Sequence, residues 1–465
     1  MVAALVITEK ASLGISPLVH SDVKAWLQKT EKLFELKQGY DEPLHLIFPH
    51  IFRSTLANYQ DLLSRLNIDF QILYAKKANK AHAFVQECAR AGVGVDCASV
   101  GELVDSVRAG VPPECIGISG PAKNKRLLML AAQLGCLVAL DSLDELEHAA
   151  QIARAVGKPL RILLRIRPES QQNSRFGFSE AEFSIACEHL ETLPVFLMLE
   201  GLSFHLSGYD LQERAAFALE VAHRIVKMRY KFPHCRKLNI GGGLPISYVS
   251  EPIWNEFLRG NSEDNFHANR RFDGFYPYYS PVSGVEALSA ILTQEQGEGS
   301  LRDFLHQHGL SILLEPGRAL LDQAGITLFS VQGLKDRGDY SIATVDGTSF
   351  SVSEQWFGSE FLPDPILITP IKRGGDSCQA CIGGVSCLDR DMLTWRKVMF
   401  PQRPKVGDLV CYMNTAGYQM DSNESEFHNL PLPEKLCLFS TNEADAWCRD
   451  SAYLAIMDED DLDGI

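Results

Sequence analysis

A lysine with the potential for covalent chemistry lies in the stretch Ile72-Leu73-Tyr74-Ala75-Lys76-Lys77-Ala78-Asn79. Burying an ammonium group disfavours its charged form and lowers its pKa. A lysine such as Lys77, at the end of a buried apolar run, can therefore form a Schiff base with a carbonyl compound. The ordinary alternative is a strand that runs out into a solvated, lysine-rich turn. This stretch alone does not decide between the two.

Three other stretches carry groups that such a lysine could use. Gly241-Gly242-Gly243 would let backbone amides approach an anion closely, Glu315-Pro316-Gly317-Arg318 offers a carboxylate and a guanidinium, and His205 ends an apolar run. Taken singly, they are equally well explained as a tight turn, a surface ion pair and a core histidine. Taken together, they are the groups that a pyridoxal phosphate (PLP) site needs for the phosphate, the pyridine nitrogen and the ring face.

Eight short apolar runs, each followed by a helix-like segment, must position these residues. They are Ile72–Asn79, Val93–Ser99, Cys115–Gly120, Cys136–Asp141, Arg161–Arg167, Leu199–Ser207, Lys237–Gly243 and Ser311–Arg318. This alternation predicts a parallel (β/α)8 TIM-like barrel over residues 40–322, with a doubly wound open sheet as the alternative. The polar residues end the runs, where barrel enzymes keep their chemistry. The long stretch 244–310 is interpreted as an insertion that forms a lid or an interface element.

The remainder of the chain predicts a second, mainly β domain formed by residues 323–465 together with residues 1–39. Six apolar runs separated by turn residues lie at 324–334, 340–346, 365–372, 379–387, 408–413 and 435–440. Near the N-terminus, residues 21–36 predict one capped amphipathic helix.

Composition narrows the choice of partners. The formal net charge of -15 argues against a nucleic-acid or anionic-membrane partner, and no apolar stretch is long enough to span a bilayer. The N-terminus lacks the basic segment and cleavage site of a signal peptide, and the twelve cysteines are expected to be reduced thiols, so we expect a cytoplasmic protein. Cys378, Cys381 and Cys387 cluster without an evident fourth ligand, so no metal site is predicted.

These motifs and their order resemble the PLP-dependent decarboxylases of fold type III, which include diaminopimelate, ornithine and arginine decarboxylases. The resemblance covers residues 40 to 430 and implies a barrel followed by a C-terminal β domain. The matching stretches are 74–79, Asp96-Cys97-Ala98-Ser99 with Gly101-Glu102-Leu103, Asp141-Ser142 with Glu145-Leu146, Arg165, Ser174-Arg175-Phe176-Gly177, His205, the triple glycine, Glu315 to Arg318, Cys387 with Asp391, and Ala416-Gly417-Tyr418.

The resemblance implies a role for each matching residue. Lys77 would hold PLP covalently, His205 would stack on its ring, and Glu315 would keep its pyridine nitrogen protonated. Cys387, contributed to the site of the other subunit, would return a proton to the carbanion, which implies a head-to-tail homodimer with active sites at the interface. The remaining cofactor-binding residues would be Asp96, Arg165, Gly241, Gly242, Gly243, Arg318 and Tyr418.

Departures from the family pattern bear on the substrate. Leu388 replaces an acidic residue that in relatives meets the distal amine of the substrate, Asp364-Pro365 replaces an Arg-Pro pair, and Ser207-Gly208 reverses a Gly-Ser pair. The candidates for substrate contact are Asp346, Asp389 and Asp391.

The sequence therefore predicts a PLP-dependent decarboxylase of a non-standard amino acid or amino-acid conjugate. An amino-acid racemase of the same fold and an inactive homologue that binds a protein partner remain as alternatives.

Overall fold

The computed structural model describes residues 13–40, 42–193, 196–297, 299–352, 354, 358–371, 373, 376–440 and 445–455. The chain divides into two compact units. The barrel unit comprises Arg53–Pro245, Val282–Leu320 and Leu454–Ile465, and the β unit comprises Met1–Phe52, Ile246–Pro281 and Leu321–Tyr453. The stretch 244–310, interpreted above as one insertion, is thus shared between the two units.

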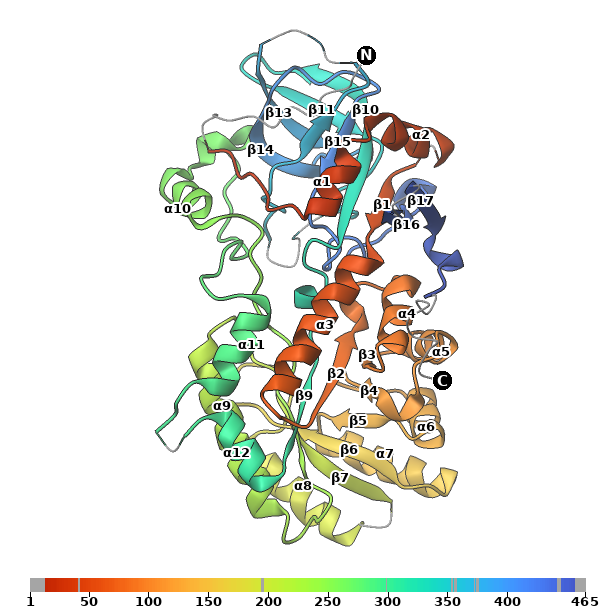
Figure 1. Ribbon diagram of the computed structural model, residues 1–465, viewed down its shortest axis with the longest axis vertical. Helices are drawn as coiled ribbons and strands as arrows, with labels where there is room; N and C mark the ends of the chain where they lie inside the picture. Colours follow the sequence, from red (N-terminus) through yellow and green to blue (C-terminus); the bar gives the residue numbers. More distant parts are fainter. Residues whose placement is uncertain are drawn as a thin grey trace. The chain divides into compact units, whose positions relative to one another are not determined.

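The barrel unit contains a closed barrel of eight parallel strands (Figure 1). Its closure is direct, because the first strand pairs with the last through Phe70 and Ile312. The strands are β2 (Phe70–Ala75), β3 (Gly94–Cys97), β4 (Ile116–Ile118), β5 (Leu137–Leu140), β6 (Leu160–Arg165), β7 (Leu197–Ser203), β8 (Lys237–Asn239) and β9 (Ser311–Leu314). Each lies within or next to one of the eight predicted runs. The predicted barrel is confirmed, and the open-sheet alternative is wrong.

Helices connect successive strands of the barrel (Figure 1). They are α4 (His82–Arg90), α5 (Val100–Arg108), α6 (Lys125–Leu134), α7 (Leu143–Val156), α8 (Glu180–Thr192), α9 (Leu211–Met228), α11 (Gly284–Thr293) and α12 (Leu301–His308), and α3 (Pro49–Arg65) leads into β2. Inside the barrel, buried side chains such as Leu73, Leu163 and Leu313 form a packed apolar core.

Two of the sequence motifs are helix starts. Ser99 caps α5 by accepting a hydrogen bond from the backbone N–H of Glu102, and Ser142 caps α7 by accepting one from the N–H of Glu145. Such caps satisfy amide groups that the first turn of a helix leaves unpaired. Each of these two helices therefore begins within three residues of the end of the preceding strand.

The β unit is built on a sheet with nine strands among the described residues. The predicted runs correspond to β10 (Gly325–Asp336), β11 (Ser341–Val345), β12 (Ile366–Ile368), β13 (Cys378–Gly383), β15 (Leu409–Tyr412) and β16 (Glu434–Ser440). Three strands were not predicted, namely β1 (Leu44–Ile47), β14 (Met392–Phe400) and β17 (Asp445–Arg449). Although β1 lies inside the range 40–322 expected for the barrel, it pairs with β10 and β16 of the β unit.

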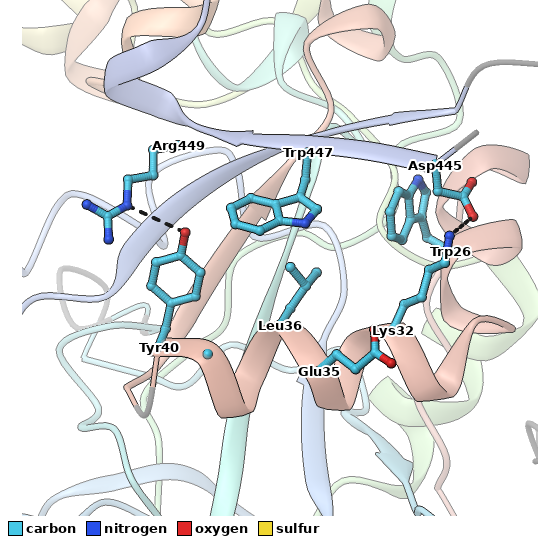
Figure 2. Close-up of a pocket in the computed structure, with 9 residues that line it drawn as sticks. Trp26, Lys32, Glu35, Leu36, Tyr40, Asp445, Trp447 and Arg449 are labelled. Atoms are coloured by element: carbon cyan, nitrogen blue, oxygen red, sulfur yellow. Dashed lines mark hydrogen bonds and ion pairs between the residues drawn. The ribbon is translucent and has the colours of Figure 1, made fainter. Parts of the chain in front are cut away.

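The region predicted as one helix over residues 21–36 forms two, α1 (Ser21–Leu27) and α2 (Thr30–Tyr40). Figure 2 shows that α2 presents side chains to the outer strand β17 across a pocket of about 420 Å³. Lys32 pairs with Asp445 at 2.6 Å, and the rings of Tyr40 and Trp447 meet edge to face. These contacts cover one face of an outer strand of the sheet, and none of the predicted site residues lines this pocket.

The remaining helix of the β unit, α10 (Glu251–Gly260), comes from the stretch 244–310. Within the described ranges, no helix has the length and apolar character needed to cross a membrane. In the same ranges, no group of three or more His, Cys, Asp and Glu side chains could hold a metal ion. All twelve cysteines are free thiols.

Candidate active site

A cavity of about 410 Å³ lies at the carboxyl ends of the barrel strands. Four residues predicted from the sequence line it, namely Lys77, Arg165, His205 and Glu315. The other lining residues are Ala98, Ser119, Gly120, Pro121, Ala139, Phe176, Ser203, Phe204 and Ser207. The cavity therefore unites side chains from several different strand ends, as expected for a barrel active site.

The two adjacent lysines have different surroundings. Both belong to a short 3-10 turn, η1 (Lys76–Ala78), that directly follows β2. The side chain of Lys76 is 2% exposed, with its Nζ 3.5 Å from a carboxylate oxygen of Asp105. Lys77 is exposed and lines the cavity. Of the two amines, that of Lys77 is therefore available to a bound carbonyl compound.

Glu315 follows β9, the strand that pairs with β2, and its orientation is fixed by a residue that we did not predict. Asn239, at the end of β8, donates a hydrogen bond from Nδ2 to Oε1 of Glu315 at 2.7 Å. The Oδ1 of Asn239 accepts a hydrogen bond from the N–H of Gly241 at 2.8 Å. Asn239 thus joins the carboxylate to the glycine loop. The available signal was a polar residue near the end of the seventh run, two positions before the first glycine.

The triple glycine is sterically required. Gly241 has a φ of +67°, and a Cβ there would lie 2.7 Å from Nδ1 of His205 and 2.8 Å from the carbonyl oxygen of Phe204. A Cβ at Gly242 would lie 2.5 Å from the carbonyl oxygen of Glu315. Side chains are therefore excluded where the loop passes the ends of β7 and β9, and the loop backbone lies close to both strands.

His205 is neutral at physiological pH. Burial, together with the positive charges of Lys77, Arg214 and Arg165, lowers its pKa to about 3. Its Nδ1 lies 3.4 Å from the backbone nitrogen of Gly242 and accepts that N–H, so the ring proton resides on Nε2. A neutral, oriented imidazole is suited to packing against a planar ring.

Asp96 is a second carboxyl group beside Lys77 and Glu315. Burial and the negative charge of Glu315 raise its pKa well above the usual value, whereas Lys77 acts in the opposite direction. Its Oδ2 accepts a hydrogen bond from the hydroxyl of Ser119 at 2.8 Å, and its buried Oδ1 has no hydrogen-bond partner among the described residues. Asp96 is 3% exposed and is not among the residues that line the cavity, so its predicted contact with the cofactor remains a prediction.

Arg165 is held by Asp141 and by an aromatic ring. Its Nη1 lies 3.3 Å from Oδ1 of Asp141, and its guanidinium lies 4.4 Å from the centre of the Phe176 ring. The other oxygen of Asp141 accepts the N–H of Gly177 at 3.1 Å, which ties the stretch 174–177 to the end of β5. Asp141 thus fixes Arg165 at the wall of the cavity.

A buried arginine beneath the glycine loop was also not predicted. Arg214, on α9, is fully buried and donates hydrogen bonds to the carbonyl oxygens of Ile240 and Leu206, both at 3.2 Å. A Cβ at Gly243 would lie 2.6 Å from its Nη2. Burial lowers the pKa of Arg214 to about 10, and the guanidinium still places a positive charge behind the loop. Helical periodicity could have indicated that Arg214 is buried, because it lies on the same face of α9 as buried Ala218 and Ile225.

These residues fit PLP. Lys77 and Glu315 line one cavity, and the buried guanidinium of Arg214 places a positive charge beside the glycine loop. The Oγ of Ser203, a residue that lines the cavity, is buried and has no hydrogen-bond partner among the described residues. Arg318, the remaining predicted phosphate ligand of this unit, is buried at the start of η6 (Arg318–Leu320).

The other predicted residues belong to the β unit. Cys387 is exposed, and its backbone N–H donates to Nε2 of His428 at 3.2 Å. Tyr418 is half-buried with a φ of +75°. Asp389 is exposed on the loop that follows Cys387. The roles of these residues remain predictions.

Two predicted substrate contacts already have protein partners. Asp346 accepts a hydrogen bond from Nζ of Lys37 at 2.6 Å and another from the N–H of Ser330 at 2.9 Å. The two carboxylate oxygens of Asp391 accept the N–H groups of Ser349 and Ser386. In this structure both aspartates therefore stabilise the β unit.

The fold is a (β/α)8 barrel, and a lysine, a histidine and a glutamate line one cavity at the ends of its strands. The model of the family described as pyridoxal-dependent decarboxylase, pyridoxal binding domain, matches residues 52–264.

The uncharacterised protein y4yA of Sinorhizobium fredii is 36% identical over 440 residues, which are 94% of this chain and 96% of that protein. The L-glutamyl-[BtrI acyl-carrier protein] decarboxylase of Niallia circulans is 24% identical over 399 residues, covering 81% and 85% of the two chains. The crystal structure of diaminopimelate decarboxylase from Helicobacter pylori in complex with L-lysine has the same fold, with a TM-score of 0.70, 20% identity and coverage of 89% and 95%. The chain belongs to the family of PLP-dependent fold-type-III decarboxylases, and its cofactor is pyridoxal 5'-phosphate.

Proposed function

We propose that this protein removes the α-carboxylate of an amino acid or amino-acid conjugate as carbon dioxide. The observation that carries the proposal is the pairing of Lys77 and Glu315 in one cavity, with Glu315 held in place by Asn239. Glu315 would hold a proton on the pyridine nitrogen. The resulting positive ring favours withdrawal of electrons from the bond to the departing carboxylate.

When bound, PLP supplies an aldehyde that reacts with amines and a ring that takes up the electron pair left by carbon dioxide. The residues of the chain hold and orient this group. Lys77 would bind it through the amine, the loop 241–243 and Arg318 would hold the phosphate, and neutral His205 would pack on the ring. Because its pKa is about 3, His205 would not add a positive charge that competes with the protonated pyridine nitrogen.

Protonation of the carbon that has lost carbon dioxide requires an acid. We assign this role to Cys387, the exposed thiol in the loop after β13. In our proposal the acid at each barrel is Cys387 of the partner subunit, so the active form is a head-to-tail homodimer with two equivalent sites. Tyr418 and Arg165 would contribute to phosphate and cofactor binding. We place this reaction in the cytoplasm.

The substrate is expected to be an amino acid with a modified distal end. Relatives act, by their names, on diaminopimelate and on a glutamyl group carried by an acyl-carrier protein. In the family that the chain resembles, the residue after the cysteine is acidic and meets the distal amine of the substrate. In this chain that position is Leu388, which is 46% exposed. The simple diamino acids would therefore be poor substrates.

The test is spectroscopic. The purified protein with PLP should show a visible absorbance band that borohydride abolishes, and peptide mapping should place the reduced adduct on Lys77. Lys77→Ala should lack the band and Lys76→Ala should keep it, because Lys76 is buried against Asp105. Amino acids and their conjugates would then be screened for release of carbon dioxide.

The alternatives give different results. Loss of optical activity without gas would identify a racemase. A protein that stays colourless with added PLP would be an inactive homologue, and an adduct on Lys76 would overturn the assignment of the lysine.

A further inference from the structure

A second cavity, of about 310 Å³, lies within the β unit beside the loop that carries Cys387. One wall comes from this loop through Leu388 and Arg390, and another from the stretch 244–310 through Arg270 and Phe272. Trp395 of β14 also lines it. The cavity is not part of the barrel site, and no sequence motif indicated it.

The two arginines of this cavity form no ion pair with another described residue. The guanidinium of Arg270 lies 4.4 Å from the ring centre of Trp395 and 4.9 Å from that of Phe272. Its Nε is buried and has no hydrogen-bond partner among the described residues. Neither Arg270 nor Arg390 forms an ion pair with the part of the chain that the structure describes. Burial and the positive charge of Arg390 lower the pKa of Arg270, so the two guanidinium groups repel each other in one cavity.

Two carboxylates, those of Glu360 and Asp391, also line this cavity, and both accept hydrogen bonds from backbone N–H groups. Asp391 accepts the N–H groups of Ser349 and Ser386, at 2.6 and 3.1 Å. Glu360 accepts the N–H groups of Trp395 and Arg396. Both carboxylates are buried, and Glu360 only partly offsets the charge of Arg270. The cavity therefore offers two cationic donors and aromatic walls to a ligand.

We propose that this cavity binds an anionic group at the distal end of the substrate, either a carboxylate or a phosphate ester. This inference rests on the proposed function, since it assumes that Cys387 acts on the substrate. Leu388 and Arg390 follow Cys387 by one and three residues, so a molecule that reaches the thiol lies next to this cavity. A leucine removes the negative charge that would bind a distal amine, and Arg270 and Arg390 reverse the sign of the pocket.

Guanidinium groups suit this ligand chemistry. Their planar donors bind carboxylate and phosphate oxygens in pairs, and Arg270 is already oriented by stacking on Trp395. The rings of Phe272 and Trp395 would contact the apolar part of the same molecule. The stretch 244–310 thereby acquires a function, because it supplies one of the two cations.

The test measures binding without catalysis. Glutarate, n-propyl phosphate and 1,5-diaminopentane would be titrated by calorimetry into PLP-loaded protein that has been reduced with borohydride, so that the diamine cannot react with the cofactor. We expect one or both anions to bind and the diamine not to bind, and the preferred anion distinguishes a carboxylate from a phosphate ester. Arg270→Gln and Arg390→Gln should each weaken anion binding at least about tenfold, the loss of a charge-assisted contact. Arg271→Gln is the matched control, because Arg271 is exposed and pairs with Glu263 outside the cavity.

A second variant tests the sign of the pocket without disturbing buried residues. Leu388→Glu should weaken anion binding, and the exposure of Leu388 makes misfolding an inadequate explanation. Binding of the diamine in preference to both anions, or equal affinities for Arg271→Gln, Arg270→Gln and Arg390→Gln, would overturn the proposal. If the anions bind as expected but no amino acid releases carbon dioxide, the proposed function fails while the anion site stands.

Discussion

Replacement of Asn239 by alanine tests whether the carboxylate and the glycine loop act as one unit. Asn239 is 2% exposed and makes two hydrogen bonds, one to Glu315 at 2.7 Å and one from Gly241 at 2.8 Å. Alanine can make neither. The variant therefore removes the contact that orients the carboxylate proposed to face the pyridine nitrogen and the contact that holds the loop proposed to bind the phosphate.

The expected magnitude follows from these two contacts. A hydrogen bond to a charged group contributes about 1.5–3 kcal/mol, and one between neutral groups contributes about 0.5–1.5 kcal/mol. Water that enters the vacated space would recover part of the sum. We therefore expect a loss of roughly 1.4–2.8 kcal/mol in PLP binding, which corresponds to a dissociation constant about ten- to a hundredfold higher.

The aspartate variant separates the two contacts. Asn239→Asp keeps an acceptor for the N–H of Gly241 but turns an oxygen toward Glu315. Two carboxylates at hydrogen-bond distance share one proton, so the apparent pKa of the pair rises. Below that pKa the shared proton restores a hydrogen bond, and PLP affinity should approach that of the unaltered protein. Above it, the affinity should fall toward that of Asn239→Ala.

The assay is a titration with PLP followed by absorbance, from about pH 5 to pH 8, with every value expressed relative to the unaltered protein. Normalisation removes the titration of PLP itself. Near-native affinity of Asn239→Ala would refute the reasoning, as would a deficit in Asn239→Asp that does not change with pH. Melting temperatures of both variants would show whether the barrel remains folded.

Three further changes test individual contacts. Gly241→Ala should weaken PLP binding about tenfold or more, because the added Cβ would overlap neighbouring atoms at a position with a positive φ. Gly101→Ala is the control and should leave PLP binding unchanged, because its Cβ would meet only one atom, at 3.8 Å. Equal affinities of the two variants for PLP would contradict the steric argument. His45 is fully buried with a pKa lowered from 6.5 to about 3, so the unfolded chain takes up a proton first as the pH falls. The free energy of unfolding should therefore drop by about 2 kcal/mol between pH 7 and pH 5, and the melting temperature of His45→Asn should fall less over that interval. Lys37→Met would leave the carboxylate of Asp346 buried without its cation and should lower the free energy of unfolding by about 3–5 kcal/mol. The melting temperature of this variant should fall, and the double variant Lys37→Met with Asp346→Asn should recover part of the loss.

The barrel could be predicted because its signals are local. Each of its strands is a short apolar run, and each motif residue stands where a run ends. The motifs that contain Ser99 and Ser142 are also local signals, since a helix cap binds the amide of a residue only three positions away. Closure of the barrel then brings Lys77 and Glu315 together without further information, because the first and last strands become neighbours.

The contacts that tune the site could not be read in this way. Asn239 acquires its role from Glu315, 76 residues away, and no motif marks the pair. Asp346 stands at a strand end, where a substrate contact was expected, but Lys37 occupies its carboxylate from 309 positions away. Strand β1 was not predicted for a related reason, since a short run of three apolar residues and a histidine suits either sheet and only pairing with β10 and β16 decides.

The two units differ in how freely their residues can change. In the barrel unit, Glu315, Asn239, Gly241 and His205 form one continuous set of hydrogen bonds and close contacts, so a substitution at any of them disturbs the others. Leu388, by contrast, is exposed, and substitutions at such positions cost little stability. If the proposed roles are correct, the reaction is fixed by the interlocked barrel residues, whereas the substrate is set by a loop that tolerates replacement. A change from a distal amine to a distal anion then involves the exposed positions Leu388 and Arg390 together with half-buried Arg270, and it leaves the decarboxylation chemistry in place.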